Sequence, residues 1–211
     1  DPKGFVVVAH MGVSISGFVV NPKHGFKTLA DMIDYAKKNP GKLTFGSSGA
    51  GTTTHMRLEA LKFKTGIDVL HVPYRGGSDS LNDLLAGVVD IMNEGSTLPH
   101  AKAGKLTLLN VNHTERFAEF PDVPTLTEAG VKDADVPVYF AIYAPPGTPR
   151  EIAQKINSKV NEIAGTADMK SKMQSASAVP SIRNLEEMQK LFDEDYKSIG
   201  ELIKNANIKL D

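Results

Sequence analysis

The chain contains no cysteine among its 211 residues. Disulfide bonds, zinc sites with thiolate ligands and a cysteine nucleophile are therefore excluded. No apolar run approaches the ~20 residues that a membrane-spanning helix needs. The formal net charge is only -1 and no block of basic residues occurs. The composition therefore gives no support to binding of a nucleic acid or of a charged membrane surface.

A targeting signal is not apparent either. The longest early apolar stretch, 5–8, is too short for the hydrophobic region of a signal peptide, so the chain is either cytosolic or has lost a leader. The remaining composition, with 41% hydrophobic and 23% charged residues, is ordinary for a globular protein. Its length allows one large domain or two small lobes with real cores.

Short apolar runs alternate with amphipathic helices over the first half of the chain. Thr28, with Asp31 three residues later, forms a weaker version of the capping box and predicts a helix that ends near residue 39. The β-α-β-α-β order predicts an α/β fold with a mostly parallel sheet covered by helices. We assign residues 19–116 to one complete α/β lobe. Its strands are expected at 42–45, 67–74, 88–92 and 105–112.

The rest of the chain is composed differently. We assign residues 1–18 and 117–211 to a hinge strand and a partial second lobe, in which about two strands are too few for a complete sheet. A crossover between the lobes is expected near the first two strands, with the return near 117–124. Helical spacing predicts two buried stripes, one on a helix that begins at Pro149 and one on a final helix at 184–205. They comprise Ile152, Ile156, Val160 and Ile163, and then Leu185, Met188, Leu191, Ile199 and Leu202.

The stretch "GSSGAGTTTH", residues 46–55, lies between a predicted strand and a predicted helix. Gly46 and Gly51 have the spacing of a nucleotide phosphate-binding loop, but Thr52 stands where its lysine should be. The dinucleotide fingerprint also fails, because Thr54 replaces its third glycine. The loop is instead rich in hydroxyl groups, uncharged and placed at a positive helix end. Such a site suits a carboxylate, although a tight turn with capping threonines is an equal alternative.

Catalytic chemistry finds little support in the sequence. The spacing around Ser47 and Ser48 does not match the nucleophile elbow of α/β-hydrolases. The six histidines lack the spacing of a metal site, and the acidic residues form no close pair. His55 stands out because it could bond back to its own loop. An enzyme on this scaffold would have only His55 and Glu94 as candidate bases.

Several segments, in the same order, resemble the substrate-binding proteins of tripartite tricarboxylate transporters, which are Bug-type periplasmic receptors. They are "GKLTFGSSGAGTTTHM", "HVPYRGGSDSLNDLLAGVVDIM", "LPHAKAGKL", "FPDVPTLTEAG" and "APPGTP". The resemblance implies a two-lobed periplasmic-binding-protein-like fold of type II. It also implies further N-terminal residues in one lobe that this chain lacks.

The resemblance also implies a function. Family members are non-enzymatic receptors that capture a small carboxylate and present it to the permease subunits of a membrane transporter. We therefore expect a periplasmic monomer without cofactor, metal or nucleic-acid partner. The resemblance places ligand contacts in the glycine-hydroxyl loop, in the loop after the strand at 90–92, which is two residues shorter here, and in the strand at 138–143. The candidate residues are Ser47, Ser48, Gly49, Gly51, Thr52, Thr53, Glu94, Ser96, Tyr139 and Phe140.

Two functional hypotheses therefore stand at this stage. The first is a solute receptor for a di- or tricarboxylate or for an aromatic or amino-acid carboxylate. The alternative is an α/β enzyme that acts on a carboxylated or phosphorylated metabolite.

Overall fold

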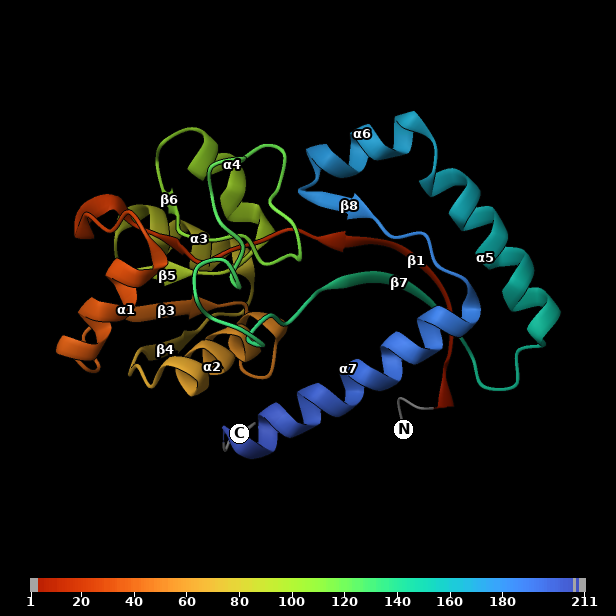
Figure 1. Ribbon diagram of the computed structural model, residues 1–211, viewed down its shortest axis with the longest axis horizontal. Coiled ribbons are helices and arrows are strands. Elements are labelled where there is room, and N and C mark those ends of the chain that lie inside the picture. The colour runs from red at the N-terminus through yellow and green to blue at the C-terminus, as the bar shows by residue number, and fades with distance from the viewer. Residues whose placement is uncertain (1–3, 207, 209–211) are drawn as a thin grey trace. The chain divides into compact units, whose positions relative to one another are not determined.

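A computed structural model describes residues 4–206 and 208, and they form two compact units (Figure 1). One unit comprises the described residues of 1–14 together with 138–200, and the other comprises 15–137 with those of 201–211. The chain passes between them at 14/15, 137/138 and 200/201. The return therefore lies at 137/138 instead of 117–124, and the segment 117–137 belongs to the unit that follows residue 14.

The larger unit contains a five-stranded sheet with the strand order β4-β3-β5-β2-β6. Strand β3 is parallel to both β4 and β5, whereas β2 is antiparallel to β5 and β6. The predicted parallel arrangement thus holds for β3, β4 and β5 and fails at β2. The strands are β2 (Val19–Val20), β3 (Thr44–Ser47), β4 (Leu70–Pro73), β5 (Ile91–Met92) and β6 (Thr107–Leu108).

Helices of this unit begin and end at residues that the sequence marks. The helices are α1 (Leu29–Lys38), α2 (Thr53–Thr65), α3 (Gly77–Ala86) and α4 (Leu98–Lys102), with 3-10 helices η2 (Pro22–His24) and η3 (Gly95–Thr97). At the start of α1, the Thr28 hydroxyl accepts from the Asp31 amide at 3.1 Å. The Asp31 carboxylate in turn accepts from the Thr28 amide at 2.9 Å. This confirms the predicted capping box.

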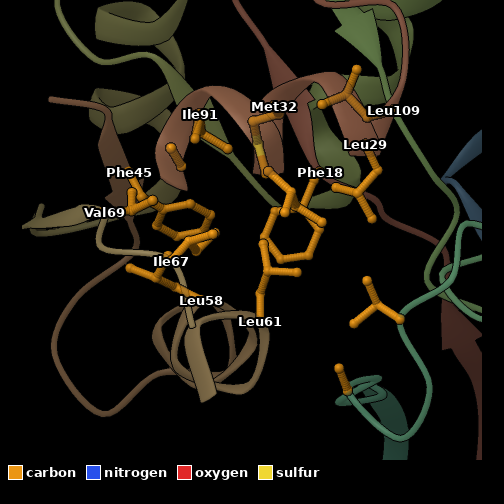
Figure 2. Packing of buried hydrophobic residues seen from close by; sticks show 14 of the residues in the cluster. Phe18, Leu29, Met32, Phe45, Leu58, Leu61, Ile67, Val69, Ile91 and Leu109 are labelled. Carbon is orange, nitrogen blue, oxygen red and sulfur yellow. The ribbon is translucent and has the colours of Figure 1, made fainter. Parts of the chain in front are cut away.

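The core of the larger unit is one continuous apolar cluster, part of which Figure 2 shows. Phe18 and Phe45 meet edge to face at its centre, with ring centroids 6.1 Å apart. The segment 117–137 contributes Leu126, Val131 and Val136 to this cluster. Burial of these three side chains explains why the segment packs with the larger unit, since each buried aliphatic side chain contributes about 1.5–3 kcal/mol.

Asp90 connects β3 to the η2 segment within the larger unit. Its carboxylate accepts hydrogen bonds from the Thr44 amide and hydroxyl, both at 2.8 Å, and contacts His24 at 2.6 Å and Lys23 at 2.8 Å. Burial alone would raise the pKa of Asp90, but these hydrogen bonds hold it at about 2. The carboxylate is therefore ionised and stabilising at neutral pH.

The smaller unit has a three-stranded antiparallel sheet with the order β7-β1-β8. Helix α5 packs against β1 (Figure 1), where the Asn157 side-chain amide donates to the Val8 carbonyl at 3.0 Å. The small core of this unit comprises Val8, Ala144 and Ala153. The elements are β1 (Val6–Ser14), β7 (Tyr139–Ala144), α5 (Arg150–Ala164), α6 (Ala167–Ser175), β8 (Ala178–Pro180) and α7 (Leu185–Asn205), whose last residues belong to the larger unit.

The predicted buried stripe of α5 is wrong. Ile152, Ile156 and Ile163 are 48%, 37% and 45% exposed, and the helix buries Ala153, Asn157 and Ala164 instead. Small side chains allow the close approach to β1 that the Asn157 hydrogen bond requires. The helix also begins at Arg150, one residue later than predicted. In α7, only Met188 of the predicted stripe is fully buried. None of the described helices combines the length and apolar character needed to cross a membrane.

Candidate ligand-binding site

Three loops of the larger unit meet at one edge of its sheet. Because β3, β4 and β5 are parallel, their carboxyl ends lie together, and the loops at 48–52, 74–76 and 93–94 follow them. Ligands of open α/β sheets characteristically bind at this edge. The fold thus brings the predicted loop residues, Glu94 and Ser96 to one edge.

The loop after β3 is shaped by Ser47, which is fully buried. Its Oγ lies 2.6 Å from His71 Nε2 and accepts from the Gly49 amide at 3.1 Å. Gly49 and Gly51 have φ values of 133° and 75°, which strongly favour glycine. The buried Ser47 side chain therefore stabilises the turn from the protein interior, and its hydroxyl is not exposed at the surface.

Three hydroxyl groups line the turn into α2. Thr54 Oγ1 lies 2.9 Å from the Thr52 hydroxyl and 3.0 Å from the Ser48 hydroxyl, and it accepts from the Ser48 amide at 3.1 Å. The Thr52 hydroxyl donates to the Gly49 carbonyl at 2.7 Å. Thr54 was missing from the predicted residues, although its place two residues after Thr52 in a hydroxyl-rich run could have suggested it.

The first turn of α2 has open backbone donors. Thr52 is the N-cap, but its side chain makes no capping hydrogen bond, and the first intrahelical bond recorded at this end is Met56 N–H to the Thr52 carbonyl. Among the described residues, the amides of Thr53, Thr54 and His55 therefore have no acceptor. Thr53 is half-buried at the start of the helix. Amides without an acceptor at the positive end of a 13-residue helix are donors of the kind that favour an anion, which makes this turn the candidate site.

Two histidines lie under this loop. Gly51 N–H donates to His55 Nδ1 at 3.1 Å, which confirms that His55 bonds back to its own loop. The His55 and His71 rings are stacked, with centroids 4.0 Å apart and planes at 4°. Burial first, and then the neighbouring His55, lowers the pKa of His71 to about 4. Burial likewise lowers the pKa of His55. Both rings are therefore neutral at physiological pH.

Glu94 and Ser96 follow β5 at the same edge. The Glu94 carboxylate lies directly against Gly77 at the start of α3, where a side chain would have no room. Ser96 is exposed and donates to this carboxylate at 3.4 Å. Burial raises the pKa of Glu94, and the hydrogen bond from Ser96 and the charge of Arg57 oppose this rise.

Arg57, one turn into α2, is a buried cation that was not among the residues predicted from the sequence. Only 2% of it is exposed, and its Nε donates to the Val136 carbonyl at 2.8 Å. Its Nη1 donates to Asn93 Oδ1 at 3.3 Å, while Nη2 has no partner among the described atoms. Burial lowers the pKa of Arg57 to about 10, against the charges of Asp135 and Glu94, so it remains charged at neutral pH.

Tyr139 and Phe140, the two predicted aromatic contacts, lie in β7 of the smaller unit. The Tyr139 ring stacks on His10 with centroids 4.8 Å apart, and Phe140 is 43% exposed. Successive residues of a strand point to opposite faces of its sheet. The two rings therefore face opposite sides of the sheet. Tyr74, directly after β4, donates its hydroxyl to Asp83 at 2.6 Å.

The contact between Ser47 and His71 has the composition of a nucleophile and its base. Ser47 has no exposed surface, however, and the carboxylate of Glu59 lies 3.8 Å from Nε2 of the other histidine, His55. Across the described residues, no group of three or more His, Asp or Glu side chains is arranged to hold a metal ion. The arrangement suits reversible binding of an anion by neutral donors.

The fold is of the α/β type with candidate anion donors at one sheet edge, and comparison with known proteins gives the family. Residues 3–208 match the family described as "Tripartite tricarboxylate transporter family receptor". The chain belongs to this family, and the resemblance noted in its sequence is confirmed.

Two relatives illustrate the similarity. The chain is 42% identical over 142 residues to the UPF0065 protein in the gbd 5' region of Cupriavidus necator, covering 67% of this chain and 43% of the relative. It is 28% identical over 194 residues to Protein BugT of Bordetella pertussis, covering 91% of this chain and 60% of BugT. The chain spans about half the length of curated relatives that it matches.

Solved structures agree on the fold. Rpa4515 of R. palustris with adipate is 29% identical, has a TM-score of 0.88, and matches over 99% of this chain and 71% of that chain. A structure described as a periplasmic transporter is 31% identical with a TM-score of 0.88, and covers 98% of this chain and 70% of that chain. These similarities confirm the periplasmic-binding-protein-like α/β fold.

Proposed function

We propose that this chain is part of a periplasmic receptor that captures a small carboxylate and delivers it to the permease of a tripartite transporter. The observation that carries the proposal is the open amino-terminal turn of α2, whose amides at Thr53, Thr54 and His55 have no acceptor among the described residues. The family and the adipate in the related R. palustris structure support a carboxylate as the ligand class.

The ligand carboxylate would accept hydrogen bonds from these amides and from the hydroxyls of Ser48 and Thr53. The Thr52 hydroxyl, whose proton goes to the Gly49 carbonyl, would stabilise the loop. Such donors act without a paired lysine because the helix end supplies positive potential. Arg57 adds a buried positive charge one helical turn away. Ser47, Gly49 and Gly51 would define the loop shape, while Glu94 and Ser96 would restrict what occupies the neighbouring part of the edge.

We further propose that the receptor acts without catalysis and as a monomer in the periplasm. The family description and the related periplasmic structure support the compartment. The buried position of Ser47 argues against a serine nucleophile, since no substrate carbonyl could reach its Oγ. The family description also supports permease subunits as the partners.

Calorimetric titration tests this function on the natural full-length protein. The ligand panel contains adipate, mono- and tricarboxylates, amino acids and nucleotides. We expect binding of at least one carboxylate, and Thr53→Val should weaken it by about 10- to 100-fold, the range for a lost hydrogen bond to a charged group. Thr127→Val, at an exposed threonine outside the loop, is the matched control and should bind normally. Binding of nucleotides without any carboxylate would refute the proposal.

A further inference from the structure

The stacked histidines beneath the loop hold two of its backbone amides. His55 Nδ1 accepts directly from Gly51 N–H at 3.1 Å. His71 Nε2 contacts Ser47 Oγ at 2.6 Å, and that oxygen accepts from Gly49 N–H at 3.1 Å. Each of the two glycines with left-handed backbone in the loop is thus connected to one imidazole.

These contacts fix the protonation state of His55. An imidazole nitrogen can accept a hydrogen bond only when it carries no proton, so the bond from Gly51 requires a neutral ring with its proton on Nε2. That Nε2 faces the Glu59 carboxylate at 3.8 Å. Protonation of Nδ1 would place two donors against each other and release Gly51.

The contact of His71 with Ser47 is less restrictive. The serine has one proton, and it can donate either to His71 Nε2 or to the Gly49 carbonyl at 3.2 Å. His71 can therefore serve as acceptor or donor. A charge on His71 would nevertheless lie 4.0 Å from the His55 ring, in a partly buried place.

The charged groups that face the two rings come from α2. Glu59 favours a protonated ring, whereas Lys62 opposes it, and these two side chains form an ion pair at 2.9 Å. The two side chains thus act on the rings in opposite directions. Burial lowers the pKa of both histidines, and the neighbouring His55 further lowers the pKa of His71, so both rings are neutral at physiological pH.

We propose that His55 and His71 are positioning residues that hold the carboxylate loop in its binding shape, and that protonation of His55 releases Gly51 and weakens binding. This inference rests on the proposed carboxylate-binding function of the loop. It goes beyond that function because it assigns roles to two side chains that do not touch the ligand. It also predicts a pH range over which the receptor works.

Amide side chains offer matched variants that keep the hydrogen bond but cannot be protonated. In His55→Asn, the Oδ1 atom replaces the Nδ1 acceptor, and in His71→Gln, the amide replaces Nε2. His55→Leu and His71→Leu remove the hydrogen bond and keep an apolar side chain. Urea unfolding of all four variants identifies those that remain folded at the assay temperature.

The first readout is the dissociation constant for adipate of the natural full-length protein at pH 7.5. We expect each leucine variant to bind at least about tenfold more weakly, and each amide variant to bind within about threefold of the wild type. Equal losses in leucine and amide variants would refute a role through hydrogen bonding. Normal binding by folded leucine variants would refute the positioning role.

The second readout is the pH dependence from 7.5 to 4.5. At each pH, the dissociation constant of the wild type is divided by that of His55→Asn. Protonation of adipate affects both constants equally, so it does not change this ratio. We expect this ratio to rise by at least about twofold as the pH falls, because only the wild type can be protonated at position 55. A ratio that stays constant would contradict the proton-sensitive contact.

The third readout needs no ligand, so it separates this inference from the proposed function. Nitrogen NMR of the imidazoles should show His55 with its proton on Nε2, and the Gly51 amide should exchange slowly with solvent. His55→Leu should accelerate that exchange at least about tenfold, and His55→Asn should restore protection. If adipate and the other carboxylates fail to bind while these results hold, the function fails and the histidine contacts stand. Fast Gly51 exchange in the wild type would overturn the inference.

Discussion

Gly46 lies in β3, close to Ser80 of α3. Replacing Gly46 by alanine tests how closely this strand and helix pack. A Cβ at this position would overlap Ser80 Oγ and would lie 3.2 Å from Val89 Cγ2 and 3.4 Å from Tyr74 Cε2. Ser80 is fully buried, so it has little room to move. The contact with Ser80 is well inside van der Waals distance and should dominate the cost.

Overpacking of this kind costs about 1–3 kcal/mol. For a chain of 211 residues, the melting temperature of Gly46→Ala should fall by about 2–12 °C, since each kcal/mol corresponds to about 2–4 °C at this size. Ser80→Ala removes the clashing oxygen, which otherwise makes only a long contact of 3.6 Å to Met92 Sδ. The double variant should therefore recover more than half of the loss.

Urea unfolding of the two single variants and of the double variant measures this coupling free energy directly. We expect a coupling of about 1 kcal/mol or more in favour of the double variant. Gly200→Ala is the matched control, because a Cβ there meets nothing within 4 Å and lies inside α7. It should be neutral or stabilising by up to about 1 kcal/mol. Additive effects at Gly46 and Ser80 would refute the close packing.

Further substitutions test other parts of the structure. Asp90→Asn should lower stability at pH 7 and reduce the loss of stability that the wild type shows as the pH falls from about 4 toward 2, because the share that Asp90 contributes is removed; acid unfolding curves measure this difference. Thr28→Ala should cost about 1 kcal/mol in urea unfolding through loss of the α1 cap, and no cost would contradict the capping box. Ile152→Glu should change stability by less than about 0.5 kcal/mol, because this side chain is exposed, whereas a loss of several kcal/mol would show that it is buried.

The sequence predicted those features that depend on neighbouring residues. The capping box at Thr28 and the turn before α2 follow from local backbone chemistry, and both are present. Even the bond from His55 to its own loop spans only four residues. Such features need no knowledge of the tertiary fold.

Features that depend on distant partners were predicted less well. The apolar stripe of α5 suggested a buried face, but Asn157 reaches a carbonyl 149 residues away and thereby turns other residues toward β1. Arg57 is buried because its acceptors lie at Val136 and Asn93. No role was assigned to His71 from the sequence, because its partner Ser47 lies 24 residues earlier. A single sequence contains no signal for these pairings.

The central claim is that the amino-terminal turn of α2 binds a carboxylate. The most direct measurement is an NMR titration of the isotope-labelled natural full-length protein with adipate, followed by a tricarboxylate if adipate does not bind. We predict that the amide signals of Thr53, Thr54 and His55 shift most, in proportion to occupancy, because their N–H groups gain an acceptor. Saturable binding that leaves these three amides unchanged would contradict the account.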